Sequence, residues 1–364
     1  MGSRPTHSKR HPGNRRVQAL RVVAIGGGTG LSTLLKGLKR FANVPGNHLS
    51  AGSGQPVISS LCAVVTVTDD GGSSGRLRKE LNMLPPGDIR NCIVALSEDE
   101  ALMSKLFRHR FDKGSGLEGH SFGNLFLAAL TAMTKDFGEA VRLSSEVLAT
   151  RGHIYPATTS NVELEALMED GSRVRGETKI TASKGRIQEL FLVPPNAEPL
   201  SQTLDAIAHA NLITIGPGSL FTSLIPNLLV RGIPQAIAES PAVKVYICNL
   251  MTQANESLGR TAADHIKALN AHAGGQIFDY ALINKRPVSQ EMKAKYASEG
   301  AAPVDADCEA IRGLGVVPVL GDYLDSGEVA RHATDRIAQD LMRLAAEPAR
   351  SRRPAAEKPR PSRA

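Results

Sequence analysis

Two adjacent carboxylates, Asp69 and Asp70, end an apolar, β-branched run and are followed by small residues (VVTVTDDGGSSG, residues 64–75). The run before them is typical of a buried strand, and parallel sheets bind ligands just beyond the carboxyl ends of their strands. Small residues there let the backbone turn tightly and expose N–H groups, as a phosphate requires. The alternative is a polar turn with an aspartate as helix cap. The candidate ligand residues are Asp69, Asp70, Gly72, Ser73 and Ser74.

A strand, a glycine loop and a helix follow one another near the start of the chain (VVAIGGGTGLSTLLKGL, residues 22–38). Such a unit presents backbone N–H groups and a helix N-terminus to a phosphate. The dinucleotide pattern GxGxxG fails, because a frame begun at Gly26 ends on Leu31, and GxxxxGK[ST] fails too. The loop predicts a phosphate or nucleotide without specifying which, or else a tight turn that needs glycine for packing. Its candidates are Gly27, Gly28, Thr29 and Gly30.

A second unit of the same kind lies in ANLITIGPGSLF (residues 210–221). Its strand is predicted to end at Ile215, and its helix to begin near Ser219. Two such units in one chain favour an anionic ligand between two helix N-termini, each of which contributes about 0.3–1 kcal/mol. The candidates here are Gly216, Gly218, Ser219 and, after the next strand, Asn249.

Polar residues at two further helix starts are also candidates. His120 and Asn124 lie in GHSFGN, before a helix that is apolar nearly all round, and Arg90 follows the Pro-Pro-Gly turn of LPPGDIRN. A buried helix does not need so polar a start, which favours ligand contact, although a structural role is the alternative for His120. We expect Asp88 to cap its own helix rather than to bind a ligand.

The elements that carry these residues alternate as in an α/β protein with a parallel sheet. Residues 99–150 are predicted to be wholly helical. Residues 155–193 alternate apolar and polar side chains between tight turns, which predicts an antiparallel insert that includes SRVRGETKIT as a strand. A capping box is predicted at Thr261 and Asp264. Further strands are predicted at PQAIA, AVKVYICN, IFDYALIN and GVVPVL, and helices at MKAKYASEG and GEVARHATDRIAQDLMRLAA.

The 364 residues suffice for one large domain or two ordinary ones. The net charge of +7 lies at the ends: residues 1–20 hold five basic and no acidic residues, 347–364 hold six basic and two acidic, and the body is at −2. This distribution argues against nucleic acid as a partner. We predict disordered basic tails at 1–20 and 347–364 and one domain over 21–346, with a helical part at about 76–150 and the β insert at about 155–195.

The sequence has no run of about 18 apolar residues and no apolar segment after its basic start, so no membrane-spanning helix or secretory signal is predicted. Its four cysteines are scattered without a CxxC pair, which excludes a zinc ribbon and indicates a reducing cytoplasm. Cys62 and Cys248 lie in apolar runs and are expected to be small core residues.

Six motifs in order resemble the gluconeogenesis factors of the CofD-like family: VVAIGGGTGLSTLLKGL, TDDGGSSGRLR, LPPGDIRNC, GHSFGNLFLAAL, IGPGSLFTSLIPNLLV and YICNLMTQ. The resemblance covers roughly residues 21–340. It implies a Rossmann-like, doubly wound, mainly parallel sheet with a helical subdomain and an antiparallel insert. It also implies a cytoplasmic protein that binds UDP-sugars, above all UDP-N-acetylglucosamine. Such proteins support cell shape and cell-wall synthesis during gluconeogenic growth, through regulatory protein partners that the resemblance does not identify.

The resemblance also implies that Tyr296, in KAKYASEG, and Arg331, in VARHAT, contact the UDP-sugar. One departure is MTQANES (residues 251–257), where the family has MTQPGET, so no role is carried onto Asn255 or Glu256. The sister branch, 2-phospho-L-lactate transferase, moves a phospholactyl group from a guanylyl donor to a deazaflavin. DDGGSSG and PPGDIRN belong to the gluconeogenesis-factor branch.

Three functions follow from these patterns, of which the weakest is an RNA- or membrane-surface protein that acts through its basic tails. The first is a non-catalytic regulator, because the sequence has no Ser-His-Asp spacing, no HExxH and no Walker lysine. The second is a phosphotransferase of the sister type, in which Asp69 and Asp70 are the catalytic candidates and hold Mg²⁺ with a bound nucleotide. No other cofactor or metal is predicted, and a homo-oligomer is left open.

Overall fold

A computed structural model describes residues 18–42, 56–98, 100–183 and 185–347. Seven strands form one sheet in the order β10-β9-β8-β7-β1-β2-β3, and every neighbouring pair is parallel. The predicted α/β fold with a doubly wound parallel sheet is therefore confirmed. The strands are β1 (Ala19–Gly26), β2 (Val57–Val65), β3 (His153–Pro156), β7 (Leu212–Ile215), β8 (Val243–Ile247), β9 (Tyr280–Asn284) and β10 (Val317–Gly321).

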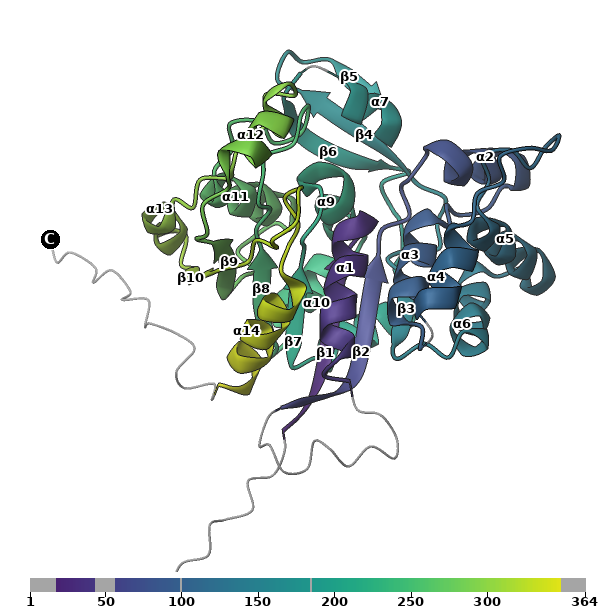
Figure 1. Ribbon diagram of the computed structural model, residues 1–364, viewed down its shortest axis with the longest axis horizontal. Helices are drawn as coiled ribbons and strands as arrows, with labels where there is room; N and C mark the ends of the chain where they lie inside the picture. The colour runs from purple at the N-terminus through teal and green to yellow at the C-terminus, as the bar shows by residue number, and fades with distance from the viewer. Residues whose placement is uncertain (1–17, 43–55, 99, 184, 348–364) are drawn as a thin grey trace, which may run out of the picture.

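Helices cover both faces of this sheet (Figure 1). α1 packs on α3 and α14 over one face, and α9 and α10 pack with α8 and α11 over the other. α2 to α6 form the helical part beside β3. The helices are α1 (Gly28–Lys39), α2 (Gly72–Leu81), α3 (Gly87–Leu96), α4 (Glu100–Arg108), α5 (Phe122–Thr134), α6 (Phe137–Val147), α7 (Glu177–Ala182), α8 (Ser201–Ala208), the π-helical turn η2 (Leu220–Leu224), α9 (Ile225–Leu228), α10 (Ile233–Glu239), α11 (Ala262–His272), α12 (Gln290–Ala297), α13 (Cys308–Gly313) and α14 (Thr334–Ala346).

The predicted tails lie almost wholly outside the described residues, which begin at 18 and end at 347. Within the described ranges, every helix is too short or too polar to cross a membrane.

The strand order reverses next to β1. From β1 the chain builds β2 and β3 outward on one side, and from β7 it builds β8, β9 and β10 outward on the other. The crevice at the carboxyl ends of the two strands at such a reversal is where open α/β sheets bind ligands. The two predicted glycine loops follow these very strands, β1 and β7. The topology therefore brings together loops that lie almost 190 residues apart in the sequence.

The antiparallel insert is confirmed as a separate three-stranded sheet of β4 (Glu163–Met168), β5 (Arg173–Arg175) and β6 (Ile187–Val193). Two details of the prediction were wrong. Tyr155 belongs to β3 of the main sheet, where it pairs with Val64. GETKIT forms α7 rather than a strand, because Asp70 accepts hydrogen bonds from the backbone N and the hydroxyl of Thr178 at the start of that helix. The two residues are 108 positions apart, so no local pattern reveals this cap.

Two predicted helical segments were wrong in part, and the predicted strand PQAIA was wrong. Residues 109–121 interrupt the helical part, because three glycines there have positive φ values that no helix contains. PQAIA lies in α10, where Pro234 opens the helix and Ile233 and Ile237 share its buried side. GEVARH precedes α14, because the N–H of Asp325 bonds to the carbonyl of Arg331 and holds this segment in a turn.

The core consists of aliphatic side chains from the strands and the inner helix faces. Cys62 and Cys248 are 6% and 3% exposed, which confirms them as core residues, and the capping box of Thr261 and Asp264 is confirmed at α11. A second, smaller group of apolar side chains is separate from this core. We call it the satellite cluster; it consists of Leu250, Met251, Val288, Met292 and Leu324.

Candidate functional site

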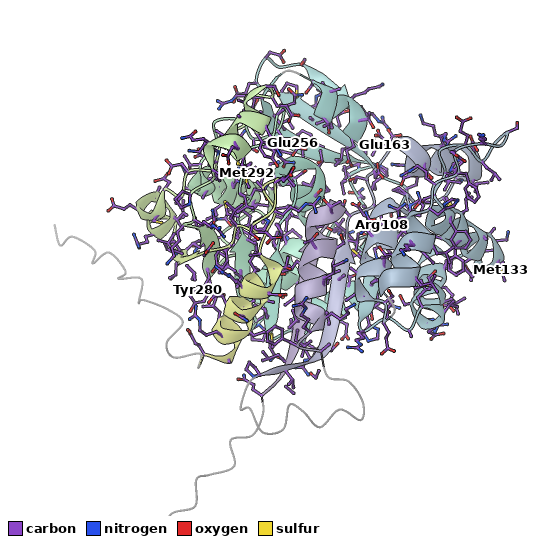
Figure 2. All side chains as sticks on the ribbon, viewed as in Figure 1. Arg108, Met133, Glu163, Glu256, Tyr280 and Met292 are labelled. Carbon is purple, nitrogen blue, oxygen red and sulfur yellow. The ribbon has the colours of Figure 1, made fainter. Side chains whose placement is uncertain are left out.

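A cavity of about 760 Å³ opens at the carboxyl ends of β1 and β7, between the insert and α12. Its size is in the range of small-molecule sites, about 300–1,000 Å³. Glu256, in its wall, and Met292, on α12, both lie above the parallel strands in the view of Figure 2. Nine of the predicted site residues line the cavity: Gly27, Gly28, Thr29, Gly30, Asp69, Gly218, Ser219, Asn249 and Tyr296.

The two glycine loops touch each other at Gly30. A Cβ added there would lie 2.8 Å from the carbonyl carbon of Pro217 and 3.1 Å from the N of Gly218. Real Cβ atoms do not approach backbone so closely, so only glycine permits this contact. The contact fixes the starts of α1 and η2 next to each other at one end of the cavity.

Asp88 occupies the N-terminus of α1, which corrects the expectation that it caps its own helix. The N-cap of α3 is Pro86, without a side-chain cap. Instead, Asp88 Oδ2 accepts a hydrogen bond of 2.7 Å from the N–H of Gly28. Burial raises the pKa of Asp88 to about 6, against the lowering effect of this hydrogen bond and together with the charge of Asp69. A carboxyl group of the chain thus takes a place that a phosphate was expected to take.

Glu256 makes a similar contact at the second unit. Its Oε2 accepts from the N of Phe221 at 3.3 Å, and its Oε1 accepts from the hydroxyl of Thr222 at 2.8 Å. The residue is 6% exposed, and burial raises its pKa. Each glycine-loop unit therefore faces an acidic side chain from elsewhere in the chain.

Further carboxyl groups extend this acidic wall. The Thr68 hydroxyl donates to Glu177 Oε2 at 3.2 Å, and burial, with the charges of Asp69 and Asp88, raises the pKa of Glu177 to about 9. Among the described residues that line the cavity there is no Lys or Arg. The net charge of the wall therefore depends on how many of its carboxyl groups are protonated. These groups belong to Asp69, Asp88, Glu177, Glu256 and Glu299.

Asp70 turns away from the cavity. Its Oδ1 accepts from the N of Thr178 at 2.8 Å, whereas Asp69 Oδ1 accepts from the N of Gly71 at 2.9 Å. No group of three or more His, Cys, Asp or Glu residues within the described ranges is arranged to hold a metal ion. The two aspartate side chains thus bond to different segments, and the Mg²⁺ pair considered from the sequence stays a prediction.

Ser73, His120 and Asn124 form a buried polar cluster of their own. Ser73 Oγ is 2.9 Å from His120 Nδ1, and Asn124 Nδ2 donates to Ser73 Oγ at 3.0 Å. Arg90 donates to the hydroxyl of Ser121, the N-cap of α5, at 2.6 Å. These contacts join α2, α3 and α5. The predicted residues that do not line the cavity are Asp70, Gly72, Ser73, Ser74, Arg90, His120, Asn124, Gly216 and Arg331.

Amide side chains hold the second loop. Asn249 Nδ2 donates to the carbonyl of Gly218 at 2.9 Å, and its Oδ1 accepts from the N of Gly218 at 3.3 Å. Gln253 Nε2 donates to Ser219 Oγ at 2.9 Å. The loop is thus positioned by the end of β8, the neighbouring strand.

Tyr296 and Arg331 differ in their relation to the cavity. Tyr296 lines it, and its hydroxyl accepts a hydrogen bond of 3.2 Å from the N of Ala330. Arg331 is exposed and lies between Ala330 and His332, both of which line the cavity. Arg331 is therefore a cation next to the rim of an acidic cavity.

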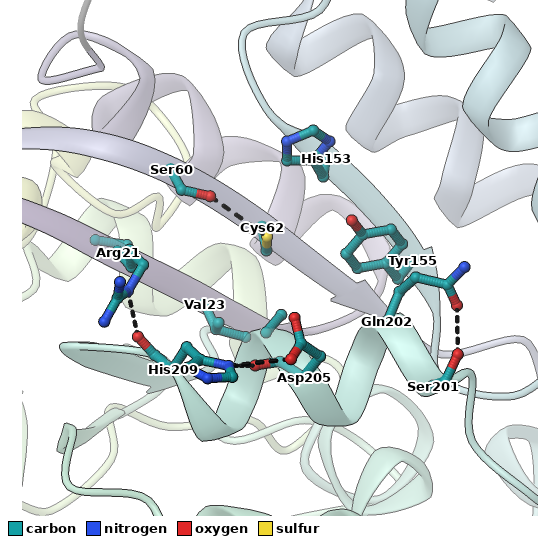
Figure 3. A pocket seen from close by; sticks show the side chains of 12 residues that line it. Arg21, Val23, Ser60, Cys62, His153, Tyr155, Ser201, Gln202, Asp205 and His209 are labelled. Carbon is teal, nitrogen blue, oxygen red and sulfur yellow. Dashed lines mark hydrogen bonds and ion pairs between the residues drawn. The ribbon is translucent and has the colours of Figure 1, made fainter.

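A second cavity, of about 460 Å³, lies along β1, β2 and β3 beside α8 (Figure 3). Some of its polar groups are paired with one another: Arg21 donates to the carbonyl of His209, and His209 Nδ1 lies 3.1 Å from Asp205 Oδ1. Neither glycine loop lines it. The cavity at the glycine loops is therefore the better candidate for a phosphate-bearing ligand.

The lining residues that were not predicted from the sequence include the acids Asp88, Glu177 and Glu256. For Asp88 the available signal was its place in LPPGDIRN, a motif already expected near the site. Glu177 and Glu256 give no local signal, because their partners Thr68 and Thr222 lie 109 and 34 positions away.

These features define a Rossmann-like α/β protein with a polar cavity at the switch point of its parallel sheet. The family model described as 2-phospho-L-lactate transferase CofD matches residues 22–324, and the chain belongs to the CofD family. It is 48% identical over 323 residues to the gluconeogenesis factor of Halalkalibacterium halodurans, which covers 88% of this chain and 95% of that relative. It is also 48% identical over 329 residues to the gluconeogenesis factor of Bacillus subtilis (strain 168). This match covers 90% of this chain and 98% of that relative.

A solved structure is similar to the fold over nearly the same range. The crystal structure of a UPF0052-family protein from Bacillus halodurans has a TM-score of 0.83 and 46% sequence identity, and covers 90% of this chain and 100% of that one. The predicted resemblance to the gluconeogenesis factors of the CofD-like family is therefore confirmed.

Proposed function

We propose that this protein is a regulatory protein that binds a UDP-sugar, above all UDP-N-acetylglucosamine, in the cavity at the glycine loops. The main support is the position of that cavity, because both glycine loops and Tyr296 line one space at the switch point of the sheet. A tyrosine ring can stack on uracil, and the carboxyl groups of Asp69 and Glu177 can accept hydrogen bonds from sugar hydroxyls. Arg331, next to the rim, suits a diphosphate.

Similarity to proteins named gluconeogenesis factor supports the biological side of the proposal. The protein acts in the cytoplasm, supports cell shape and cell-wall synthesis during gluconeogenic growth, and reports the supply of UDP-sugar to protein partners. The domain that binds the ligand spans residues 21–346, and the basic tails are not needed for binding.

A phosphotransferase of the 2-phospho-L-lactate transferase type is the second candidate. The match to the CofD family model favours it. This function requires a guanylyl ligand at the same cavity and turnover that depends on a divalent cation.

Calorimetric titration of UDP-N-acetylglucosamine and of GDP, each with and without Mg²⁺, separates the two functions. A regulator binds the UDP-sugar without Mg²⁺, and Arg331→Ala weakens this binding about tenfold or more, which corresponds to about 1.4 kcal/mol. Arg312→Ala, an exposed arginine of α13 outside the cavity, is the matched control and leaves the affinity unchanged. Absence of UDP-sugar binding overturns the proposal, and Mg²⁺-dependent turnover of a guanylyl donor establishes the alternative.

A further inference from the structure

The carboxyl group of Asp88 lies where the first glycine loop offers its N–H groups. Asp88 Oδ2 accepts from the N of Gly28 at 2.7 Å, and a Cβ added to Gly27 would come within 2.9 Å of the same oxygen. The start of α1 is therefore already in contact with an acid of the chain. A ligand phosphate at this helix start would lie next to the Asp88 carboxyl group.

The charged and titratable groups around Asp88 come from several elements. Asp69 lies between β2 and α2, and Glu177 lies at the start of α7. Arg90 and Cys92 lie on α3, the helix that also carries Asp88. Asp69 and Glu177 line the cavity together with Asp88, whereas Arg90 is bonded to Ser121 and Asn91 outside it. An ionised Asp88 therefore repels a diphosphate, and the described lining residues include no Lys or Arg to balance that repulsion.

We propose that Asp88 is a positioning residue that couples the binding of a phosphate-bearing ligand in this cavity to the uptake of one proton. The inference rests on the proposed function, since it concerns the same ligand and cavity. A proton from solvent binds one oxygen of the Asp88 carboxylate. The neutral carboxylic acid then donates its O–H to a phosphate oxygen, while its other oxygen still accepts from the N–H of Gly28. No covalent bond of the ligand changes.

The pKa of the Asp88 carboxyl group agrees with its position at the start of α1. Burial already raises the pKa of Asp88 to about 6 in the protein without ligand, and a bound diphosphate nearby raises it further. Between these two pKa values the complex holds a proton that the free protein lacks. Affinity therefore rises as the pH falls through that interval, by at most about tenfold per pH unit for one proton.

UDP-N-acetylglucosamine is the appropriate probe, because neither of its phosphates has a free terminal group. UDP carries a terminal phosphate with a pKa of about 6, which would add its own pH dependence. We expect calorimetric titrations of the full chain to show tighter binding at about pH 5.5 than at about pH 7.5. Titrations near pH 7 in two buffers of different ionisation enthalpy should show uptake of a fraction of a proton, at most about one, for each ligand bound.

Asp88→Asn tests the assignment. The asparagine Oδ1 keeps the contact with Gly28, and its Nδ2 donates to the phosphate at every pH. We expect an affinity close to the low-pH value of the wild type, no dependence on pH, and no proton uptake. Asp69→Asn is the matched control. It removes a charge from the same wall, but the carboxyl group that it removes does not bond to Gly28. Its pH dependence remains, with the transition at lower pH, because the charge of Asp69 raises the pKa of Asp88.

Three results overturn the inference. Wild-type affinity that does not change with pH and is accompanied by no proton uptake contradicts the coupling, and this measurement does not depend on whether a variant folds. An Asp88→Asn protein with the same pH dependence as the wild type assigns the proton to another group. Absence of binding at every pH overturns the proposed function, and the coupling with it.

Discussion

Carboxyl groups determine the chemistry of this site at the level of single residues. Asp88 and Glu256 each bond to the first turn after a glycine loop, and Glu177 lies beside them. Phosphate loops usually present free N–H groups and lysine or arginine side chains. This cavity instead combines glycine loops with acids, which suits a ligand with many hydroxyl groups and makes protonation part of binding.

Glu177→Gln tests the acidic wall through stability. Folding raises the pKa of Glu177 from an ordinary value of about 4.3 to about 9, so the folded protein holds a proton that the unfolded chain has lost. Between these values the free energy of unfolding falls as pH rises, by at most about 1.4 kcal/mol per pH unit. In Glu177→Gln this contribution is absent, and the glutamine oxygen still accepts from Thr68. Urea unfolding at about pH 5.5 and about pH 8 measures this effect. Between these two pH values, the free energy of unfolding should fall less in the variant than in the wild type.

The control for this prediction is Glu169→Gln, an exposed glutamate of the same insert. Its unfolding free energy should follow the wild-type pH dependence. Equal pH dependence in Glu177→Gln and wild type would show that Glu177 is ionised in the folded protein at neutral pH.

At the level of elements, the contact between the two glycine loops fixes the starts of α1 and η2 next to each other at one end of the cavity. Gly30→Ala places a methyl group against Pro217, so one loop must move. We expect a loss of about 1–3 kcal/mol in the free energy of unfolding, as for other overpacked sites, and a loss of UDP-sugar binding. Urea unfolding and calorimetry measure the two effects.

Gly275→Ala is the control for Gly30→Ala. It lies after α11, and a Cβ there meets no atom within 4 Å. Its stability should stay within about 0.5 kcal/mol of the wild type. If Gly30→Ala were equally neutral and bound ligand normally, the loop contact would not be needed for the site.

Local signals predicted most elements, and tertiary contacts explain the failures. The strand–glycine loop–helix units are local and were predicted correctly up to the first helical residues. α7 was missed because its cap, Asp70, is 108 residues away, and α10 because a short Ile-Pro-Gln-Ala-Ile segment fits both periods. Likewise, the glycine loops of the site could be predicted, whereas Asp88, Glu177 and Glu256 depend on partners 34 to 109 residues distant.

Both edges of the main sheet carry a proline whose missing N–H lies on the free side. The N of Ala157 bonds to Val65, so the N of Pro156 points away from β2, and the N of Val317 bonds to Asp279, so that of Pro318 points away from β9. Each edge of the sheet therefore lacks one N–H donor for pairing with a strand of another molecule. If the protein forms a homo-oligomer, we expect its subunits to meet through helices or loops.

At the level of the whole molecule, the walls of the cavity pack on two separate apolar clusters. The glycine loops rest on the main core, whereas Tyr296 and the residues near Ala330 rest on the satellite cluster. A small apolar cluster stabilises less than a large core, so the wall built on it should open more often. Hydrogen bonds link its two segments directly: the N of Ala330 donates to the Tyr296 hydroxyl, and Lys295 Nζ donates to the carbonyl and the carboxylate of Glu328.

Hydrogen exchange followed by mass spectrometry tests this division. In the free protein, amides of α12 and residues 322–333 should exchange faster than those of β1 and β7. UDP-N-acetylglucosamine should slow exchange at α12 and 322–333 more than elsewhere, because in the proposed complex the ligand contacts Tyr296 and holds this wall closed. Met292→Ala removes a side chain that is 7% exposed in the satellite cluster.

In Met292→Ala we expect faster exchange in the same two segments and weaker ligand binding, with β1 and β7 unchanged, because the lost packing lies outside the main core. Met133→Ala, at a methionine that is 77% exposed on α5, is the control and should match the wild type. Uniform exchange across the protein, or protection by ligand that is confined to β1 and β7, would show that the α12 wall is as rigid as the core and does not close on the ligand.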